Sequence, residues 1–394
     1  MTRALICIVS GHEGYGVRQV WSDLINGLSA QGCRMIIGVL DTSRATEWKS
    51  AYPNATIVAP DKAINLSVQA TGHFWFYRAM AKRAVALTWQ IVWLERLVRH
   101  FEADALLIQV SFDVPLAGIV ARWRGVRAYW FVSNFVDSGK VFDFNRRIYR
   151  WIFRHLGVIP VSNSRFTDQT FGVGDFERHV VHLGVDTKIF RPGMDGSTIR
   201  KHYNISPDEP VIGLFARMTV QKGQLRLIKA IAEAKIDCHV LLCGGPLEGG
   251  YYASIKEAAK ATGLANRVHF AGFQNDLLPY YAACDIVTNL RDTPEAFGLT
   301  VVEAMACGRP VLAHALGGPS ETIVDNETGW LIPGYQPRDI AAGLIRVFAD
   351  RARWQKMGKA ARQRAETAFA LEHFVDKAAN IVTSEKRTKR EGMK

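Results

Sequence analysis

Short apolar runs, separated by glycine turns and helical patterns, recur along the whole of this 394-residue chain. Strands that are apolar on both faces and alternate with helices are typical of parallel sheets that helices cover on both sides. Two series of such runs follow one another, which predicts an α/β protein with two doubly wound, Rossmann-like parallel sheets. We expect the strands at residues 4–9, 35–40, 105–110, 128–132, 158–161, 211–215, 239–243, 267–270, 286–290 and 311–313.

A break in this pattern near residues 190–196 predicts a link between two domains. The residues that interrupt the periodicity there are Pro192, Gly193 and Gly196. A chain of this length suits two α/β domains of similar size, so we expect one domain at residues 1–190 and a second at residues 191–372. A C-terminal helix and basic tail at residues 373–394 are expected to pack back toward the first domain.

Composition and charge narrow the class of protein. No stretch reaches the roughly 18 uninterrupted apolar residues of a membrane-spanning helix, and the run at residues 4–9 is shorter than a signal peptide requires. Six cysteines without the spacing of zinc ligands are typical of free thiols in a reducing compartment, so we expect a cytoplasmic protein. The net charge of +12 favours an anionic partner, whether a phosphorylated substrate, a membrane surface or a nucleic acid.

The segment after the predicted strand at residues 286–290 has the residues of a ligand-binding loop and a short helix. Glu295 stands before this helix and Glu303 one turn inside it, near the strand end where α/β folds bind ligands. Their carboxylates can accept hydrogen bonds from sugar hydroxyls on either side of a diphosphate; the alternative is an ordinary helix cap with a surface glutamate. We expect the anionic oxygens at the free N–H groups that open the helix, those of Phe297, Gly298 and Leu299.

A second loop contributes two cations. Arg217 and Lys222 follow the predicted strand at residues 211–215 and precede the next helical pattern. Two cations at the mouth of a parallel sheet can hold a diphosphate and neutralise the charge of a departing nucleotide. Loop cations are more often only solvated, so this interpretation depends on their combination with Glu295 and Glu303.

The spacing of Glu295 and Glu303 resembles the E-x7-E motif of the GT4-type retaining glycosyltransferases, which have the GT-B fold. Residues 317–321 and 329–331 fit the same signature, and the two loop cations resemble the donor-phosphate pair of that family. The resemblance implies two Rossmann-like domains that face each other across a cleft, the first binding the acceptor and the second the nucleotide sugar. It also implies that Glu295 contacts the donor sugar and that Glu303 contacts the nucleotide ribose.

A glycine-containing loop at residues 11–16 follows the first predicted strand. It fails as a dinucleotide fingerprint because Gln19 stands where a third glycine or alanine belongs. The resemblance places this loop near the donor phosphate and the acceptor, whereas the alternative is a simple turn. The residues expected near the donor phosphate are Gly14 and Gly16. The polar residues available to the acceptor are His12 and Glu13.

The first domain departs from the family after the predicted strand at residues 128–132. Many relatives carry a His-Asp pair there, with the histidine near the donor sugar, whereas this chain has Ser133 and Asn134. Neither side chain can act as a base near neutral pH. We therefore expect both on the acceptor side of the site, and we expect no mechanism that needs a histidine base at this place.

The chain contains no Asp-x-Asp sequence, so a metal-chelating donor site is not expected. In the family that it resembles, positive side chains and helix termini take the place of a metal ion in stabilising the negative charge of the donor. The nucleotide diphosphate sugar is a substrate, so we expect neither a metal nor another cofactor.

Aromatic and basic residues are interleaved over residues 74–100 and again at residues 122–124 and 146–151. A basic, tryptophan-rich amphipathic surface suits the headgroup layer of an anionic bilayer. The alternative is a helix whose aromatic residues pack into the core while its charges are solvated. No recognised nucleic-acid-binding module accompanies this surface, so nucleic acid is not the expected partner.

These features predict a hexosyl- or related transferase that moves a sugar from a nucleotide diphosphate sugar to an acceptor hydroxyl. The resemblance implies retention of the anomeric configuration, a front-face mechanism in which the leaving phosphate helps to deprotonate the acceptor, and domain closure that excludes water. We expect a carbohydrate or lipid-linked acceptor of cell-surface polysaccharide, lipopolysaccharide or glycolipid synthesis. The expected location is the cytoplasm, including the inner face of the plasma membrane.

Three other functions share parts of this pattern. A sugar-nucleotide epimerase has the same architecture, but the E-x7-E motif argues against it. A glycogen-type phosphorylase would need a longer chain and the context of a cofactor lysine. A non-catalytic, membrane-associated sugar-binding protein would keep the fold and transfer nothing, and an assay of acceptor-dependent nucleotide release separates it from a transferase.

Overall fold

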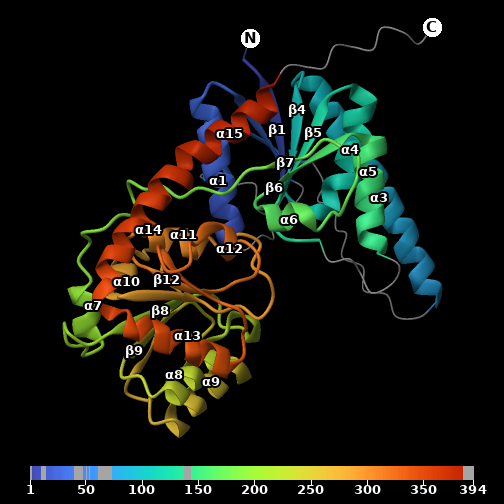
Figure 1. Ribbon diagram of the computed structural model, residues 1–394. Coiled ribbons are helices and arrows are strands. Elements are labelled where there is room, and N and C mark those ends of the chain that lie inside the picture. Colours follow the sequence, from blue (N-terminus) through green and yellow to red (C-terminus); the bar gives the residue numbers. More distant parts are fainter. Residues whose placement is uncertain are drawn as a thin grey trace, which may run out of the picture. The chain divides into compact units, whose positions relative to one another are not determined.

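The chain divides into two compact units in this computed structural model. Unit 1 comprises Met1–His182 and Phe374–Lys394, and unit 2 comprises Leu183–His373. Figure 1 shows one sheet in each unit, with helices packed against it. Only the backbone is described at residues 15 and 73–84. The residues that the structure describes are 2–9, 15–39, 48–49, 51–52, 54–60, 73–136 and 143–384.

Unit 1 is built on a seven-stranded sheet in the order β3-β2-β1-β4-β5-β6-β7, in which all neighbouring strands are parallel. The chain first adds β2 and β3 on one side of β1 and then adds β4 to β7 on the other. The strands are β1 (Ala4–Val9), β2 (Arg34–Val39), β3 (Thr56–Val58), β4 (Ala105–Ile108), β5 (Arg127–Val132), β6 (Val158–Ser162) and β7 (His179–Val180).

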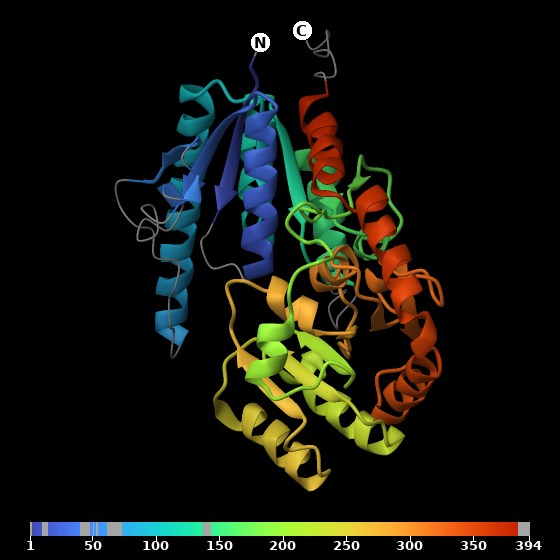
Figure 2. The same ribbon diagram turned by 90° about the vertical axis from the view of Figure 1, so that its left-hand side faces the viewer.

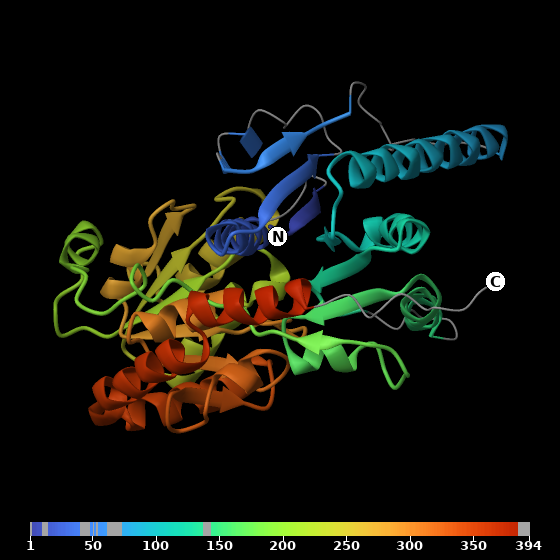
Figure 3. The ribbon, with the colours of Figure 1, turned by 90° about the horizontal axis from the view of Figure 1, so that it is seen from above.

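Helices cover both faces of the first sheet. Figure 3 shows α3, α4 and α5 side by side on one face. Figure 2 shows α1, in dark blue, along the strands on the other face. The helices are α1 (Tyr15–Ala30), α3 (His73–His100), η2 (Ser111–Asp113), α4 (Val114–Arg124), α5 (Phe144–Leu156), α6 (Arg165–Gln169) and α15 (Leu371–Thr383).

The apolar strands of unit 1 are buried because helices cover them on both sides. All six residues of β1 are buried, and Leu5 and Ile6 have no exposed surface. Each such side chain stabilises the fold by about 2 kcal/mol relative to its exposure to water. Helix α15 also packs in this unit, since the Tyr129 hydroxyl donates to the carbonyl oxygen of Ile381 over 3.0 Å.

Unit 2 contains a six-stranded parallel sheet in the order β10-β9-β8-β11-β12-β13. The chain leaves β8 toward β9 and β10, but it leaves the adjacent strand β11 toward β12 and β13. Open α/β sheets bind ligands at such a reversal, beyond the carboxyl ends of the strands. The strands are β8 (Val211–Phe215), β9 (His239–Cys243), β10 (Val268–Gly272), β11 (Ile286–Asn289), β12 (Val311–His314) and β13 (Gly329–Ile332).

Separate apolar cores lie on the two faces of the second sheet. One core contains Leu227 of α8 and Ile340 of α13, and the other contains Tyr281 of α10 and Val301 of α11. The helices of unit 2 are α7 (Ser197–His202), η3 (Val220–Lys222), α8 (Gln224–Ala234), α9 (Gly249–Ala261), α10 (Leu278–Ala283), α11 (Leu299–Ala306), α12 (Pro319–Thr322), α13 (Pro337–Ala349), η4 (Arg351–Arg353) and α14 (Trp354–Ala368). Within the described parts of the chain, no helix is both long enough and apolar enough to span a membrane.

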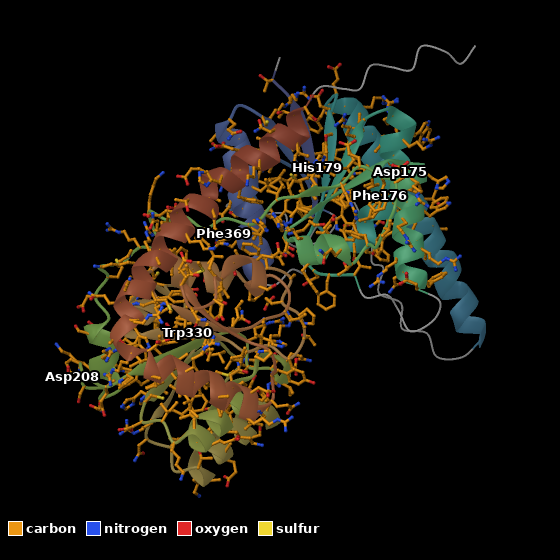
Figure 4. All side chains as sticks on the ribbon, in the orientation of Figure 1. Asp175, Phe176, His179, Asp208, Trp330 and Phe369 are labelled. Carbon is orange, nitrogen blue, oxygen red and sulfur yellow. The ribbon has the colours of Figure 1, made fainter. Side chains whose placement is uncertain are left out.

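The doubly wound α/β class predicted from the sequence is confirmed in both units. All ten predicted strands are present, with ends that differ by at most two residues. Prediction missed β3 and β7, which contain three and two residues, too few to show a period. It also missed β13, where Trp330 is wholly buried inside unit 2 (Figure 4) and its indole N–H donates to Asp350 over 3.1 Å.

Candidate functional site

Two loops at the carboxyl ends of β8 and β11 bring one predicted cation and one predicted acid together. Lys222 ends the short helix η3 that follows β8, and Glu295 lies between β11 and α11. The Lys222 Nζ atom is 2.9 Å from Oε2 of Glu295. This charge-assisted hydrogen bond lies at the reversal point of the second sheet, where the fold positions ligands.

Glu295 is held by a second cation that the sequence analysis did not select. The guanidinium of Arg291 donates from NH1 to Glu295 Oε1 over 3.1 Å, and its Nε donates to Thr293 Oγ1 over 2.8 Å. Only 15% of the Glu295 side chain is exposed, so both carboxylate oxygens are fixed in a largely desolvated place. The signal in the sequence is an arginine four residues before the glutamate, which is indistinguishable from an ordinary loop charge.

The backbone at Glu295 is fixed by the glycine pair that begins the 317–321 segment. Gly318 donates its N–H to the carbonyl oxygen of Glu295 over 2.7 Å. A Cβ atom on Gly317 would lie 2.2 Å from that same oxygen, and one on Gly318 would lie 2.2 Å from the carbonyl oxygen of Phe297. Two glycines are needed here because the two backbones run closer than any side chain allows.

The helix expected after the loop is present as α11, which begins at Leu299. Gly298 precedes it with φ 91°, and its carbonyl oxygen accepts from the N–H of Val301 over 2.9 Å. The first N–H groups of a helix lack intrahelical acceptors and suit an anionic oxygen. The side chain of Phe297 is buried and packs edge-on against Phe369, so only its backbone is suited to face a ligand.

Glu303 lies one turn inside α11 and is paired with a buried tyrosine. The hydroxyl of Tyr281 donates to Glu303 Oε2 over 2.7 Å. The Tyr281 ring is wholly buried and stacks on Phe215 at 4.0 Å between ring centroids. Burial, followed by the negative charge of Glu303, raises the pKa of Tyr281 well above its usual value. The hydroxyl therefore stays protonated and keeps donating to one oxygen of Glu303.

Arg217 extends from the first turn after β8 and is exposed to solvent. Two hydrogen bonds fix its backbone. The Arg217 carbonyl oxygen accepts from Gln224 Nε2 over 2.9 Å. The next residue, Met218, donates its N–H to the carbonyl oxygen of Gly245 over 2.8 Å. No hydrogen bond or ion pair with another described residue engages its guanidinium. An exposed arginine on a rigid backbone is suited to capture an anion.

Arg226 of α8 joins the two loops of the site. Its guanidinium contacts Asp292 Oδ2 at 3.1 Å and donates to the carbonyl oxygens of Val220 and Leu290 over 3.2 and 3.1 Å. The N–H of Asp292 also donates to the carbonyl oxygen of Gln221 over 3.1 Å. The loop that carries Lys222 and the loop that carries Glu295 are therefore one connected piece.

The residues predicted in the first half belong to unit 1. His12, Glu13 and Gly14 lie outside the described residues. Gly16 lies in the first turn of α1. Ser133 and Asn134 follow β5, where the Ser133 carbonyl oxygen accepts from Asn163 Nδ2 over 3.2 Å and Asn134 is exposed. Their proposed contacts with donor or acceptor stay predictions.

The described residues contain no group of three or more histidine, cysteine, aspartate or glutamate side chains that could hold a metal ion. All six cysteines are free and buried. The candidate site of unit 2 contains exposed and paired cations, helix N–H groups and two carboxylates, those of Glu295 and Glu303. Such a set can bind an anionic group together with neighbouring hydroxyls.

Residues 195–364 match the model of the family described as glycosyl transferases group 1. Similar curated proteins include the D-inositol 3-phosphate glycosyltransferase of Mycobacterium marinum, which is 34% identical over 204 residues. That match covers 50% of this chain and 43% of the relative. The corresponding protein of Mycobacteroides abscessus is 36% identical over 169 residues, which are 42% of this chain and 38% of that protein. The chain thus matches about two fifths of the length of these relatives.

Solved structures share the fold over nearly the whole chain. A glycosyltransferase from Rickettsia africae matches with a TM-score of 0.81 and 19% identity, covering 97% of this chain and 98% of its own. Anabaena HepE in complex with UDP matches with a TM-score of 0.80 and 21% identity, covering 98% and 100%. At these identities the likeness shows the fold alone, which is the GT-B fold that the sequence predicts.

Proposed function

Since residues 195–364 match the model of the glycosyl transferases group 1 family, we propose that this protein is a glycosyltransferase that uses a nucleotide diphosphate sugar. In this proposal Arg217, Lys222 and the N–H groups of residues 297–299 stabilise the leaving diphosphate, which is the largest electrostatic task of the reaction. Glu295 orients the donor sugar and Glu303 binds the nucleotide ribose. These positive groups stabilise the diphosphate without a metal ion, so the rate of sugar transfer should stay the same when a metal chelator is added.

The observation that carries the proposal is the Lys222–Glu295 pair. Nζ of Lys222 and Oε2 of Glu295 are 2.9 Å apart, so a group that binds one of them meets the other. A pyrophosphate competes for the lysine, and the adjoining sugar then faces a carboxylate that Arg291 still holds. This arrangement suits a molecule in which a diphosphate and a sugar are directly joined.

The finer parts of the proposal concern stereochemistry and acceptor. The reaction retains the anomeric configuration, and the departing phosphate takes the proton of the acceptor hydroxyl, as in the retaining GT4-type glycosyltransferases that the sequence resembles. The acceptor is a carbohydrate or a lipid-linked molecule of polysaccharide, lipopolysaccharide or glycolipid synthesis, used at the inner face of the plasma membrane.

An assay of nucleotide release tests the proposal. The protein is incubated with a panel of nucleotide sugars that begins with UDP-glucose, because Anabaena HepE is solved in complex with it. One acceptor is inositol 3-phosphate, which the name of the Mycobacterium marinum relative specifies. Lipid-linked saccharides are tested beside it. We expect nucleotide release that depends on an acceptor, with a glycosylated product of retained anomeric configuration detected by NMR.

Two lysine variants test whether sugar transfer depends on the candidate site. Lys222→Met should lower transfer by about 100-fold, because it removes one positive group from the leaving diphosphate. Lys229→Met removes an exposed lysine of α8 and should leave transfer unchanged. Equal activity of the two variants would contradict the site. Donor conversion to an epimer without nucleotide release would instead favour an epimerase, and absence of donor binding would favour a non-catalytic sugar-binding protein.

A further inference from the structure

Three neighbouring helices of unit 1 present large apolar side chains to solvent. Figure 3 shows α3, α4 and α5 in a row on one face of the first sheet, and each contacts the next. We call their solvent side, together with η2, the outer helix face. Its exposed apolar side chains are Val85, Trp89, Val92, Phe112, Ile119, Trp123, Phe144, Ile148 and Trp151.

The outward stripe is clearest on α5. Phe144, Ile148 and Trp151 recur at the spacing of one helix face, and they are 63%, 39% and 54% exposed. Ile152 and Phe153 lie on the opposite side of the same helix and are almost wholly buried in the core of unit 1. The fold therefore buries one apolar side of α5 and leaves a second one exposed to solvent.

Exposed aromatic side chains are concentrated on this face. Among the side chains that the structure describes, seven large aromatic ones stand out into solvent; five lie on this face, and the other two are Phe273 and Tyr335 in unit 2. Trp123 is the most exposed of them, at 68%. Single exposed apolar residues are ordinary, but a group of this size on adjoining helices marks an interaction surface.

The charges between these apolar residues are almost all arginines. Over residues 85–100, 114–124 and 144–156 the chain has no lysine and one acidic residue, Glu95, which lies 3.4 Å from Arg124. Asp143, directly before α5, lies 3.6 Å from both Arg146 and Arg150. The arginines of these three stretches are Arg96, Arg99, Arg122, Arg124, Arg146, Arg147, Arg150 and Arg154. Guanidinium groups bind phosphate oxygens in pairs, which makes this surface complementary to a phosphate-rich layer.

We propose that the outer helix face docks on an anionic lipid bilayer. Trp123 and Trp151 enter the headgroup layer, where amphipathic aromatic rings are most stable, and the arginines contact lipid phosphates. A second copy of the chain fits less well, because a two-fold contact would set the same arginines against each other. Nucleic acid fits less well because its protein contacts are more polar than this row of exposed apolar side chains.

This inference is independent of sugar transfer, because binding is measured with no donor or acceptor present. The whole protein is floated with vesicles of phosphatidylcholine and phosphatidylglycerol, and separately with vesicles of phosphatidylcholine alone. We expect binding to the anionic vesicles, weaker binding in high salt, and little binding to the neutral ones. Brominated lipids should quench part of the tryptophan fluorescence.

Variants identify the surface that binds. Trp123→Gln with Trp151→Gln should abolish most of the quenching by brominated lipid. Arg147→Gln with Arg154→Gln should lower the vesicle partition coefficient by about tenfold or more, because each arginine near an anionic surface contributes separately. All four side chains are exposed, so the variants should keep the circular dichroism spectrum of the parent protein.

Matched substitutions in unit 2 serve as controls. Ile345→Gln removes an exposed apolar residue of α13, and Lys356→Gln with Lys359→Gln removes two exposed charges of α14. These variants should bind vesicles as the parent protein does. Equal losses in both sets would overturn the proposal, as would the absence of vesicle binding. A concentration-dependent dimer in sedimentation velocity that only the tryptophan pair disrupts would also overturn it and would assign the face to a second copy.

Discussion

The hydroxyl of Tyr281 donates a hydrogen bond to Glu303 over 2.7 Å from a ring that has no exposed surface. The two residues come from different helices, α10 and α11, and meet within one of the two cores of unit 2. A carboxylate that a buried hydroxyl holds in place points in a defined direction. For a ligand hydroxyl, such a preset acceptor lowers the entropy lost on binding.

Tyr281→Phe removes this hydrogen bond and keeps the ring. Because the lost bond is to a charged group, we expect UDP to bind about tenfold more weakly, measured by isothermal titration calorimetry. UDP without its ribose 2′ and 3′ hydroxyls should bind the parent and the variant equally, because it lacks the hydroxyls that we propose Glu303 binds. Equal losses for both ligands would show that Tyr281 acts on overall packing instead.

Arg291→Met leaves Glu295 with Lys222 as its remaining cation. Since that lysine is also proposed to hold the diphosphate, we expect kcat/KM for the donor to fall by about tenfold. Initial rates over a range of donor concentrations measure this. Arg338→Met is the matched control, because the Arg338 side chain is 81% exposed and should not affect the rate. If both variants keep the parental kcat/KM, Arg291 has no part in positioning Glu295.

Gly317→Ala should destabilise the protein more than the same change at Gly249. Both glycines have positive φ, 80° and 82°, so both substitutions strain the backbone. Only at Gly317 does the new Cβ also meet another atom, the carbonyl oxygen of Glu295 at 2.2 Å; at Gly249 nothing lies within 4 Å. We expect an excess loss of about 2 kcal/mol or more in the free energy of unfolding. Equal losses at both positions, measured by denaturant titration, would mean that the 317–318 backbone can move away.

The stability of the protein should fall as the pH is lowered from about 6.5 toward about 4. Burial is the main cause that lowers the pKa of His269 from 6.5 to about 4, and the charge of His239 is the second. Nδ1 of His239 lies 2.8 Å from Nε2 of His269. Between these values the unfolded chain binds the proton and the native chain does not, so acid favours unfolding with a slope of at most about 1.4 kcal/mol per pH unit.

The measurement is the free energy of unfolding at several pH values within that window. His269→Gln should flatten the dependence because it removes the group that titrates. His155→Gln changes an exposed histidine of α5 and should keep the parental slope. The same slope in both variants would assign the acid sensitivity to other groups.

The strands could be predicted because a strand that helices cover on both faces is a continuous run of apolar residues. β8 and β9 have the predicted bounds, since each is a run of five buried residues. β13 could not be separated from the turn before it, because its glycine start and its single tryptophan fit a loop as well as a strand. The burial of that tryptophan depends on partners that come from elsewhere in the chain.

The side chains of the unit 2 site could be predicted only where they are charged and lie near the end of a predicted strand. Lys222 and Glu295 stand out as charges near strand ends, and the structure pairs them. Tyr281 does not stand out, because a tyrosine in an apolar helix is most often an ordinary core residue. Arg226 does not stand out either, since its partners are two loops that become neighbours only when β8 and β11 pair.

The Arg226 side chain has a consequence for exchanging parts between relatives. It binds the backbone of both loops, so neither loop has a conformation that is independent of the other. A chimaera that imports residues 291–298 alone would lose register with η3 and misplace the imported glutamate. If these loops select the donor as we propose, a transfer of donor preference between relatives requires both loops together with the first turn of α8.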